Sequence, residues 1–319
     1  MIKTIRKFPS LQQEILLVVI LLCCSLNINA SADSTSLFKV SEIASGIFVH
    51  QGSHVDFDHP MHDDIANIGF IIGDECVAVI DTGGSVKTGK SLLSTVRKTT
   101  SKPICYVINT HIHFDHLLGN IAFQDTQVKF VGHQDLLDEV TANRAFFLQQ
   151  FSTDLGKDAT QDSIIGPSIL VEETMQLDLG NRIIELTAYD SAHSHTDLSV
   201  YDEKTKSLWL SDLLFIDRIP ALDGNLKNWL KLITEMKQSP AEQIIPGHGP
   251  VIINAASAFE DQERYLTTLL SQTRSKIEEG LFMEEIVDQV GSEEKQLWLL
   301  YDQHHKRNVT KAFSELEWE

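Results

Sequence analysis

The sequence predicts an α/β protein in which two β-sheets pack together with helices outside them, a four-layered αββα sandwich with a helical C-terminal extension. Two observations predict this fold. Short apolar strands followed by an amphipathic helix occur in the first half of the chain, and the same order recurs in the second half. The residues after position 255 show helical periodicity, with Tyr265, Leu266, Leu269 and Leu270 on one stripe.

The first half of the chain contains the elements of one sheet. Residues 38–50 read as two short strands about the turn Ser45-Gly46. Apolar residues at helical spacing between 86 and 100 predict a helix, which Pro103 separates from the next strand. The other strands expected here are 67–72, 76–81, 105–110 and 128–133, and a second helix is expected over 134–151.

The second half repeats the pattern. Residues 171–179 and 182–189 are predicted strands about the turn Gly180-Asn181, and 197–202 pairs with 207–212 across "DEKTKS". An amphipathic helix is expected over 225–237, before a strand at 243–249. Several of these strands end in polar residues, and in open α/β sheets ligands bind at that end.

The first residues have the composition of an export signal. Three basic residues precede the apolar run Ile15 to Leu26, and small residues follow at Ala30 and Ala32. We interpret residues 1–32 as a cleaved signal peptide, 33–255 as the main folded domain, which contains the two-sheet sandwich, and 256–319 as the helical extension packed on it. The alternative is an uncleaved membrane anchor, for which the apolar run is short.

Charge and composition exclude some partners. The chain has a net charge of −19 with neutral histidines, and removing residues 1–32, with three basic residues and Glu14, changes it to −21. Such a surface repels nucleic acid and anionic membranes, so no nucleic-acid partner is expected. A small anionic substrate is still compatible with this net charge. Within one cleft, a bound divalent metal ion outweighs the negative potential of the rest of the protein.

Two cysteines remain after such processing. Cys76 and Cys105 each precede an apolar run, and a helical stretch separates the two runs. If the runs are adjacent parallel strands, both thiols lie at the same sheet edge and a disulfide can form in an oxidising compartment. The alternative is a pair of buried thiols.

The stretch "NTHIHFDH" concentrates potential metal ligands after the strand 105–110. His111 and His113 are two positions apart and can hold one cation, while Asp115 and His116 turn toward a second. Zinc favours this combination of imidazole and carboxylate. The alternative is a chance group of surface histidines.

Further candidate ligands follow later strands. His193 lies in "DSAHSHTD", Asp212 ends "SLWLSD" and His248 lies in "QIIPGHG". The candidates divide into two ligand shells. One consists of His111, His113 and His193, the other of Asp115, His116 and His248, and Asp212 bridges them. Two such cations can share a hydroxide nucleophile, as two-metal hydrolases do.

The motifs "THIHFDH", "AHSHTD", "LSD" and "PGHG" resemble, in order and spacing, those of the metallo-β-lactamase superfamily over residues 40–255. More narrowly, "DIANIGFIIG", "LWLSDLLFIDRIPALDGNLKNWL" and "NVTKAFSELEWE" resemble the SoxH-like branch called quinoprotein relay system zinc metallohydrolases. The resemblance implies an αββα zinc hydrolase exported to the periplasm and associated with a quinoprotein dehydrogenase system.

The resemblance also assigns the sites. The family's ligand positions fall on His111, His113, Asp115, His116, His193, Asp212 and His248, which implies two Zn²⁺ ions, although other divalent metals such as Fe or Mn are compatible. His193 fits the fourth motif better than His195, which is then exposed or supports a ligand. The aspartate at 212 resembles thioesterases of the glyoxalase II type rather than true β-lactamases, which generally have cysteine or serine there.

Asp115 is the predicted catalytic residue, because a carboxylate there can orient the shared water and pass its proton to the leaving group. Asp81 either supports a ligand histidine or caps a turn. The loop with His50, His54, His59 and His62 either contacts substrate through Phe57 or is merely solvated. Arg218 either meets an anionic substrate group or forms a surface salt bridge.

The sequence therefore predicts a binuclear metallohydrolase in which a metal-bridging hydroxide cleaves an ester, thioester or related small-molecule substrate. Two alternatives remain: a periplasmic metal-binding accessory protein without turnover, and a hydrolase with β-lactamase activity. The sequence does not determine the natural substrate or the oligomeric state.

Overall fold

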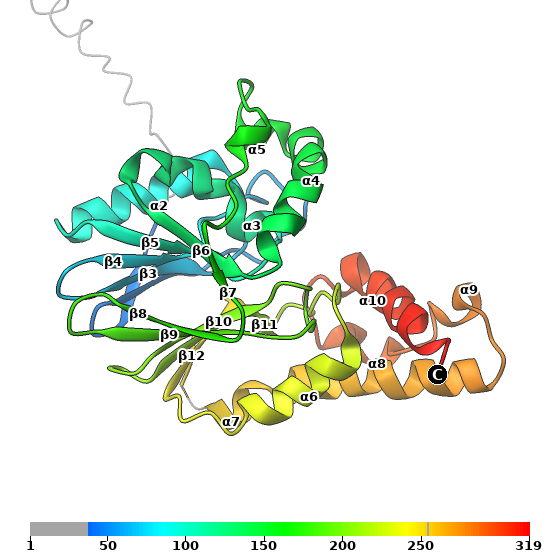
Figure 1. The fold of residues 1–319 in the computed structure, drawn as a ribbon. Helices are drawn as coiled ribbons and strands as arrows, with labels where there is room; N and C mark the ends of the chain where they lie inside the picture. Colours follow the sequence, from blue (N-terminus) through cyan, green and yellow to red (C-terminus); the bar gives the residue numbers. More distant parts are fainter. Residues whose placement is uncertain (1–37, 254) are drawn as a thin grey trace, which may run out of the picture. The chain divides into compact units, whose positions relative to one another are not determined.

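The computed structural model describes residues 38–253 and 255–319 and has two β-sheets packed face to face (Figure 1). The first sheet has strands β1 (Ser41–Ala44), β2 (Ile47–His50), β3 (Ile68–Ile72), β4 (Val77–Ile80), β5 (Ile104–Ile108), β6 (Lys129–His133) and β7 (Ile169–Val171), in that order. The predicted signal peptide lies outside the described residues. No helix within the described ranges is long and apolar enough to cross a membrane.

The second sheet contains the strands of the second half of the chain. Its order is β13 (Ile252–Ile253), β12 (Gln243–His248), β11 (Ser207–Phe215), β10 (Leu198–Asp202), β9 (Ile183–Ala188) and β8 (Thr174–Asp178). β11 and β12 are parallel, whereas β8 to β11 are antiparallel neighbours. Apolar side chains of both sheets, such as Ile71, Trp209 and Ile245, form the core between them.

Helices cover the outer face of each sheet, so the predicted αββα sandwich is confirmed (Figure 1). Those of the first half are α2 (Val86–Thr99), α3 (Phe114–Leu117), the 3-10 segment η1 (Leu118–Thr126), α4 (Leu136–Gln150), α5 (Ser152–Leu155) and η2 (Gln161–Ser163). Those of the second half are α6 (Leu226–Met236), α7 (Ala255–Ala258), α8 (Glu260–Glu278), α9 (Met283–Ile286), η3 (Ser292–Gln296) and α10 (Tyr301–Leu316).

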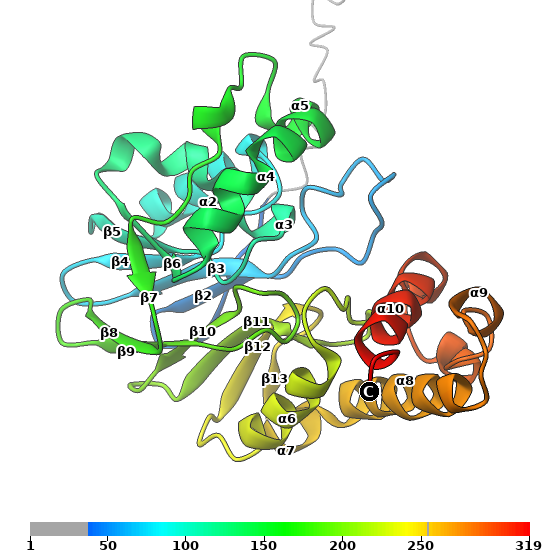
Figure 2. The ribbon, with the colours of Figure 1, turned by 45° about the vertical axis from the view of Figure 1, so that its right-hand side comes forward.

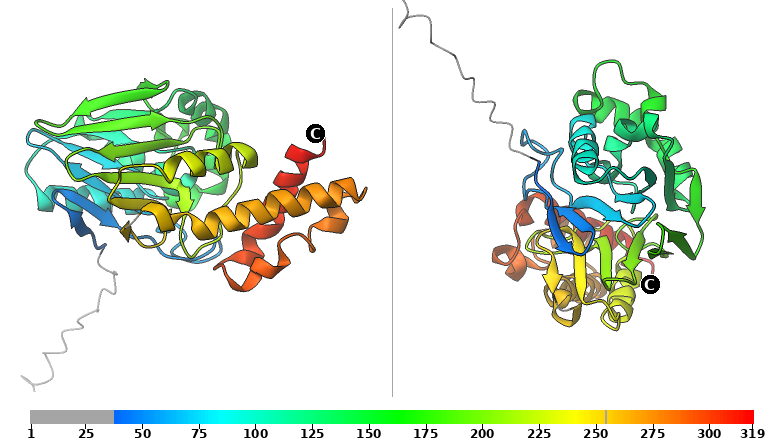
Figure 3. Two further views of the ribbon diagram at one scale, coloured as in Figure 1. Left: turned by 90° about the horizontal axis from the view of Figure 1, so that it is seen from below. Right: turned by 90° about the vertical axis from the view of Figure 1, so that its left-hand side faces the viewer.

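The C-terminal helices pack on the second sheet and on each other. Figure 2 shows α10 beside α8, and Figure 3 shows α8 running out from beneath the second sheet. Tyr265 and Leu266 of α8 share an apolar cluster with Trp229 of α6 and Val309 of α10. Helix α10 is therefore anchored to the layer that carries β11 and β12.

Two predicted strands differ from the observed ones. Residues 171–179 do not form one strand, because β7 pairs with β6 in the first sheet and β8 pairs with β9 in the second. The exposed Glu172 and Glu173 lie between them, where the chain crosses from one sheet to the other. β11 continues past Asp212 to Phe215, and its pairing with β12 shifts register at Ser211.

The structure joins Cys76 and Cys105 in a disulfide, with Cα atoms 5.8 Å apart. Cys76 immediately precedes β4 and Cys105 lies in β5, and the two strands are parallel neighbours. The sequence leaves open whether these cysteines form a disulfide or remain two buried thiols, and in the structure they form the disulfide.

Candidate metal centre

The predicted ligands come from both sheets and converge on one site. His111 and His113 lie between β5 and α3, and α3 carries Asp115 and His116. His193 lies between β9 and β10, Asp212 is within β11 and His248 ends β12. Their donor atoms form two groups, within each of which all atoms lie within 4.8 Å of one another. The groups are His111, His113, His193 and Asp212, and Asp115, His116 and His248.

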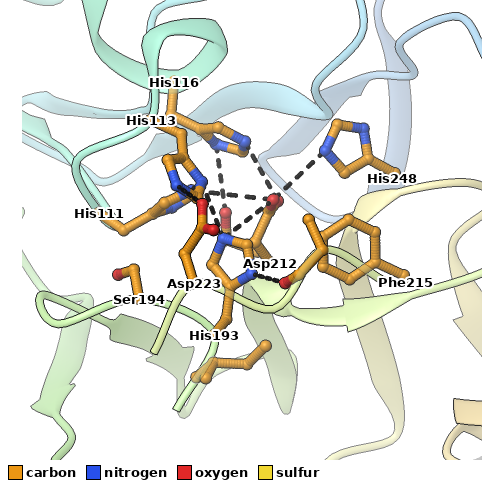
Figure 4. Close-up of polar contacts among 12 residues, drawn as sticks. His111, His113, His116, His193, Ser194, Asp212, Phe215, Asp223 and His248 are labelled. Atoms are coloured by element: carbon orange, nitrogen blue, oxygen red, sulfur yellow. Dashed lines mark hydrogen bonds and ion pairs between the residues drawn. The ribbon is translucent and has the colours of Figure 1, made fainter. Parts of the chain in front are cut away.

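Asp212 lies between the two groups (Figure 4). In the first group, His113 Nδ1 is 3.1 Å from His111 Nε2 and 2.9 Å from His193 Nε2. Asp212 Oδ2 is 3.4 Å from His193 Nε2 and 3.3 Å from His248 Nε2, while Oδ1 is 3.1 Å from His116 Nε2. One carboxylate thus faces donors of both groups.

Asp115 completes the second group. Its Oδ2 atom is 3.5 Å from both His116 Nε2 and His248 Nε2. Burial alone would raise the pKa of Asp115, but the charges of His116 and His248 outweigh burial and hold the pKa of this carboxyl below its usual range. Asp115 is therefore an anion that can accept a hydrogen bond from a water molecule.

The second ring nitrogen of each clustered histidine has its own partner. His116 Nδ1 is 2.8 Å from Asp81 Oδ2, and His113 Nε2 is 2.9 Å from Asp223 Oδ2. His193 Nδ1 and His248 Nδ1 lie 2.7 Å and 2.8 Å from the carbonyl oxygens of Ala221 and Ile65, respectively. Thr110 Oγ1 is 3.0 Å from His111 Nδ1. Partners of this kind fix the orientation of metal-binding imidazoles.

A metal ion also accounts for two poorly satisfied atoms. His116 Nε2 and Asp212 Oδ1 are buried and 3.1 Å apart, yet neither makes a well-formed hydrogen bond in the described part of the chain. Buried polar atoms without partners are costly, whereas coordination satisfies both. Burial, followed by the neighbouring charge of His116, lowers the pKa of His111 well below its ordinary value, which favours the neutral imidazole that binds metals. The residues fit a divalent metal centre.

Unusual backbone geometry places these side chains. Asp81 and Ser211 have positive φ angles of 54° and 50°, a region that residues other than glycine seldom adopt. Asp81 accepts hydrogen bonds from the Thr110 amide and hydroxyl, both at 2.8 Å. A Cβ atom on Gly247 would lie 1.8 Å from Asp212 Oδ1, so only glycine lets β12 pass this close to the carboxylate.

The sequence comparison agrees with this geometry. A family model described as the metallo-beta-lactamase superfamily matches residues 63–248, which include every residue of the two groups. The chain belongs to the metallo-β-lactamase superfamily. The metallohydrolase class, the sandwich fold and the histidine-aspartate clusters are therefore mutually consistent.

Sulfatases and β-lactamases are among the superfamily relatives. Over 99 residues, 29% of this chain and 15% of the relative, the sequence is 30% identical to a linear primary-alkylsulfatase of Pseudomonas sp. (strain ATCC 19151). A solved stereoselective inverting sec-alkylsulfatase of Pseudomonas sp. has a TM-score of 0.63 at 18% identity, covering 86% of this chain and 49% of its own. A metallo-β-lactamase from Pontibacter korlensis has a TM-score of 0.56 at 20% identity, covering 72% and 98%.

These similarities do not establish the substrate of this chain. The chain spans about half of the solved sec-alkylsulfatase and a smaller part of the primary-alkylsulfatase. At 18% and 20% identity, the solved structures show a shared fold and no more. The substrate of this superfamily member therefore has to be argued from its own residues.

The other predicted site residues of this superfamily member differ in their burial and in their contacts with the metal centre. Asp81 is fully buried and contacts His116, so it does more than cap a turn. His195 is exposed and belongs to neither group. Phe57 is half exposed and its ring centroid is 5.3 Å from that of Phe114, which adjoins Asp115. Arg218 is buried, so its interpretation as a surface salt bridge is wrong.

Several supporting residues were not assigned a role from the sequence. Asp223 holds His113 and is itself 2.6 Å from Arg307 Nη2 of α10. Asn67 donates hydrogen bonds to the carbonyls of Pro246 and Gly249 and so holds the loop around His248. Only the fold shows these contacts, because the partners are far apart along the chain.

Proposed function

We propose that this chain is an exported binuclear zinc hydrolase that cleaves an ester, thioester or related bond in a small-molecule substrate. The observation that carries the proposal is the sharing of Asp212 between two groups of buried donors, each completed by histidines. Imidazole with carboxylate suits zinc, and Fe or Mn would also find suitable ligands here.

The roles of the residues follow from their positions. His111, His113, His193 and Asp212 would hold one cation, and Asp115, His116, His248 and Asp212 the other. Two divalent cations lower the pKa of bound water and polarise the electrophilic oxygen of a substrate. The Asp115 carboxylate, next to His116 and His248, would accept a hydrogen bond from the attacking water, take up its proton during the attack and then pass that proton to the leaving group.

An aspartate at position 212 supports a reaction of the glyoxalase II type. Cysteine or serine is general at this position in the antibiotic-hydrolysing members, so β-lactam hydrolysis is at most a side reaction. A periplasmic metal-binding protein without turnover is the non-enzymatic alternative. Every position of the two groups is occupied by a donor side chain, which favours an active centre.

The periplasm is the compartment we propose. The basic and apolar leader supports export, and the Cys76–Cys105 disulfide supports an oxidising environment. The resemblance of "LWLSDLLFIDRIPALDGNLKNWL" to the SoxH-like branch supports a role beside a quinoprotein dehydrogenase system.

Sulfate-ester hydrolysis is the second candidate. It is favoured by the local match, 30% identity over 99 residues, to a linear primary-alkylsulfatase. A sulfate ester would place its anionic group beside the cations, and the exposed Phe57 would meet an apolar tail.

A substrate panel tests these functions. Metal-loaded protein is assayed with a chromogenic thioester, a phosphodiester, an alkyl sulfate and a cephalosporin, after its metal content is measured. We expect turnover of the thioester or the alkyl sulfate, and Asp115→Asn should lower kcat by about 100-fold or more. Asp138→Asn, at an exposed position of α4, is the matched control. No turnover on any substrate with two metals bound would refute the hydrolase and support the accessory protein.

A further inference from the structure

Arg218 is a buried arginine whose side chain has no hydrogen-bond or ion-pair partner among the described residues. It lies just beyond β11 and is 5% exposed. Its Nη1 atom is buried and has no hydrogen-bond partner, and the side chain forms no ion pair with any residue that the structure describes. Burying an unpaired charge costs folding free energy, so a side chain of this kind is expected to serve a function.

A second buried arginine in this fold has hydrogen-bond partners for all three of its side-chain nitrogens. Arg182 is 4% exposed and contacts Asp202 with two hydrogen bonds of 2.8 and 2.9 Å. Its third nitrogen donates to the carbonyls of Ser45 and Ile72. Arg182 is thus a structural residue, and Arg218 lacks every contact of this kind.

The backbone around Arg218 is held firmly beside the C-terminal helices. Ile219 N donates to Leu299 O at 3.1 Å, and Leu299 N donates to Asp217 O at 2.9 Å. Leu299 lies two residues before α10, and its backbone pairs with that of Arg218, so the arginine side chain projects from a braced segment rather than a free loop. Backbone hydrogen bonds therefore fix the position of the Arg218 main chain.

The guanidinium lies within electrostatic range of the metal centre. Burial lowers the pKa of Arg218, while the carboxylates of Asp115, Asp212 and Asp56 raise it. Asp115 and Asp212 are the carboxylates proposed to hold the cations. If cations occupied the two groups, they would offset these two charges, and Asp56 would be the remaining carboxylate that acts on the guanidinium.

Other unsatisfied groups lie within electrostatic range of Arg218. His54 Nδ1 and His304 Nε2 are buried and have no hydrogen-bond partner, and His304 is 7% exposed. The charge of Arg218 helps to lower the pKa of both imidazoles, after the larger effect of burial. Asp56 Oδ1 is 3.8 Å from His304 Nε2 and forms no ion pair with Arg218. These groups come from a loop after β2, from the segment after β11 and from α10.

We propose that Arg218, together with the unsatisfied imidazoles of His54 and His304, binds an anionic oxygen group of the substrate beside the metal centre. This inference rests on the proposed function and adds the substrate class, a compound with a carboxylate, sulfate or phosphate group. A guanidinium binds such groups through two parallel hydrogen bonds. Helix α10 then contributes to the substrate site through His304, and Phe57, with its ring centroid 6.2 Å from that of His304, forms the apolar edge.

Binding of inorganic sulfate and of acetate to the metal-loaded protein tests the proposal without requiring turnover. We expect Arg218→Gln to weaken sulfate binding at least about tenfold, the loss typical of a hydrogen-bonded charged group. Arg97→Gln, at an exposed position at the end of α2, should bind as the wild type does. Equal metal content in all variants excludes a change in the metals themselves. Equal affinity of Arg218→Gln and wild type, or no binding of either probe to the wild type, overturns the proposal.

Thermal stability separates a binding residue from a structural one. Removing an unpaired buried charge should leave Tm unchanged or raise it, as at other functional sites. Arg182→Gln breaks a satisfied pair and should lower Tm clearly. A comparable fall in Tm for Arg218→Gln would show that Arg218 is structural and overturn the proposal.

A matched pair of thioesters and an alkyl sulfate distinguish the source of the anion. If the anion is a remote carboxylate, Arg218→Gln raises KM for a succinyl thioester but not for the matched propionyl thioester. If the anion is the reacting group, the variant impairs alkyl sulfate hydrolysis and leaves both thioesters unaffected. Loss of sulfate binding without turnover of any substrate would refute the proposed function while retaining the anion site.

Discussion

Contacts outside the donor groups orient individual side chains of the metal centre. Each clustered histidine directs one ring nitrogen to the cluster and the other to a partner, such as Asp81 for His116 and Asp223 for His113. Such partners set the tautomer and reduce the reorganisation needed for coordination. The residue that sequence reasoning left out of the site, Asp223, is therefore expected to influence metal affinity.

Asp223→Asn should weaken metal binding at the site of His113 by about 10- to 100-fold, since the imidazole loses its carboxylate partner. Competition with a chromogenic chelator measures this affinity. Asp190→Asn removes an exposed carboxylate from a neighbouring loop and should have no effect. Unchanged affinity in Asp223→Asn would mean that the contact does not orient His113.

His304 should make folding stability depend on pH. Burial and then the charge of Arg218 lower its pKa from 6.5 to about 4, with smaller effects of His248 and Arg307, although Asp56 opposes them. The unfolded chain takes up a proton as pH falls through 6.5, whereas the folded chain does so only near 4. This contribution to stability is complete above pH 6.5 and is lost toward pH 4.

His304→Asn should therefore gain roughly 2 kcal/mol relative to the wild type when the pH is lowered from about 7.5 to about 4.5. Urea unfolding of chelator-treated protein measures this difference without interference from metal release. His59→Asn, at an exposed position, is the control. A difference between variant and wild type that is the same at both pH values would contradict the assignment.

At the scale of elements, irregular strand geometry positions the ligands. β11 shifts register at Ser211, where φ is 50°, and the next residue is Asp212. β12 approaches that carboxylate so closely that only Gly247 fits. At the other end of the first sheet, the Cys76–Cys105 disulfide joins β4 to β5 across the α2 crossover.

Replacing both cysteines, Cys76→Ala with Cys105→Ala, should cost roughly 2–4 kcal/mol, since the bond closes a loop that the unfolded chain would otherwise leave free. Guanidinium unfolding of the two proteins measures the cost. Reductant should destabilise the wild type and leave the double variant unchanged. Equal sensitivity of the two proteins to reductant would show that this bond does not account for the effect.

At the scale of the whole described unit, the metal centre connects the two sheets. His111, His113, Asp115 and His116 follow a strand of the first sheet, whereas His193, Asp212 and His248 belong to the second. Cations bound between them would link the two halves of the sandwich. Helix α10 braces the second half beside the centre, because Asn308 contacts Leu222 N and Pro220 O, and its His304 lies 3.8 Å from Asp56 of the loop after β2.

Chelation should lower Tm, because metals that bind only the folded state stabilise it by about 4 kcal/mol per site at about 1,000 times Kd. Calorimetry with and without chelator measures the shift. Asp212→Asn, which removes a charge facing both groups, should show a smaller shift. An unchanged Tm after complete removal of metal would contradict a metal link between the sheets.

The sequence by itself determined the fold class and the residues of the two donor groups. Strand and helix periodicity are local properties, so they predicted the αββα order, and the spacing of "HIHFDH" with "PGHG" selected side chains that the structure groups together. Local patterns also left choices open, such as the Cys76–Cys105 bond.

Only the tertiary structure decided the surroundings of that centre. Arg307 meets Asp223 and His304 approaches Asp56 across large separations in sequence, and neither contact leaves a trace in local periodicity. The same holds for residues 171–179, whose apolar pattern does not encode that the chain changes sheets. Packing brings these residues together, because burial is decided by the whole chain rather than by a short stretch of it.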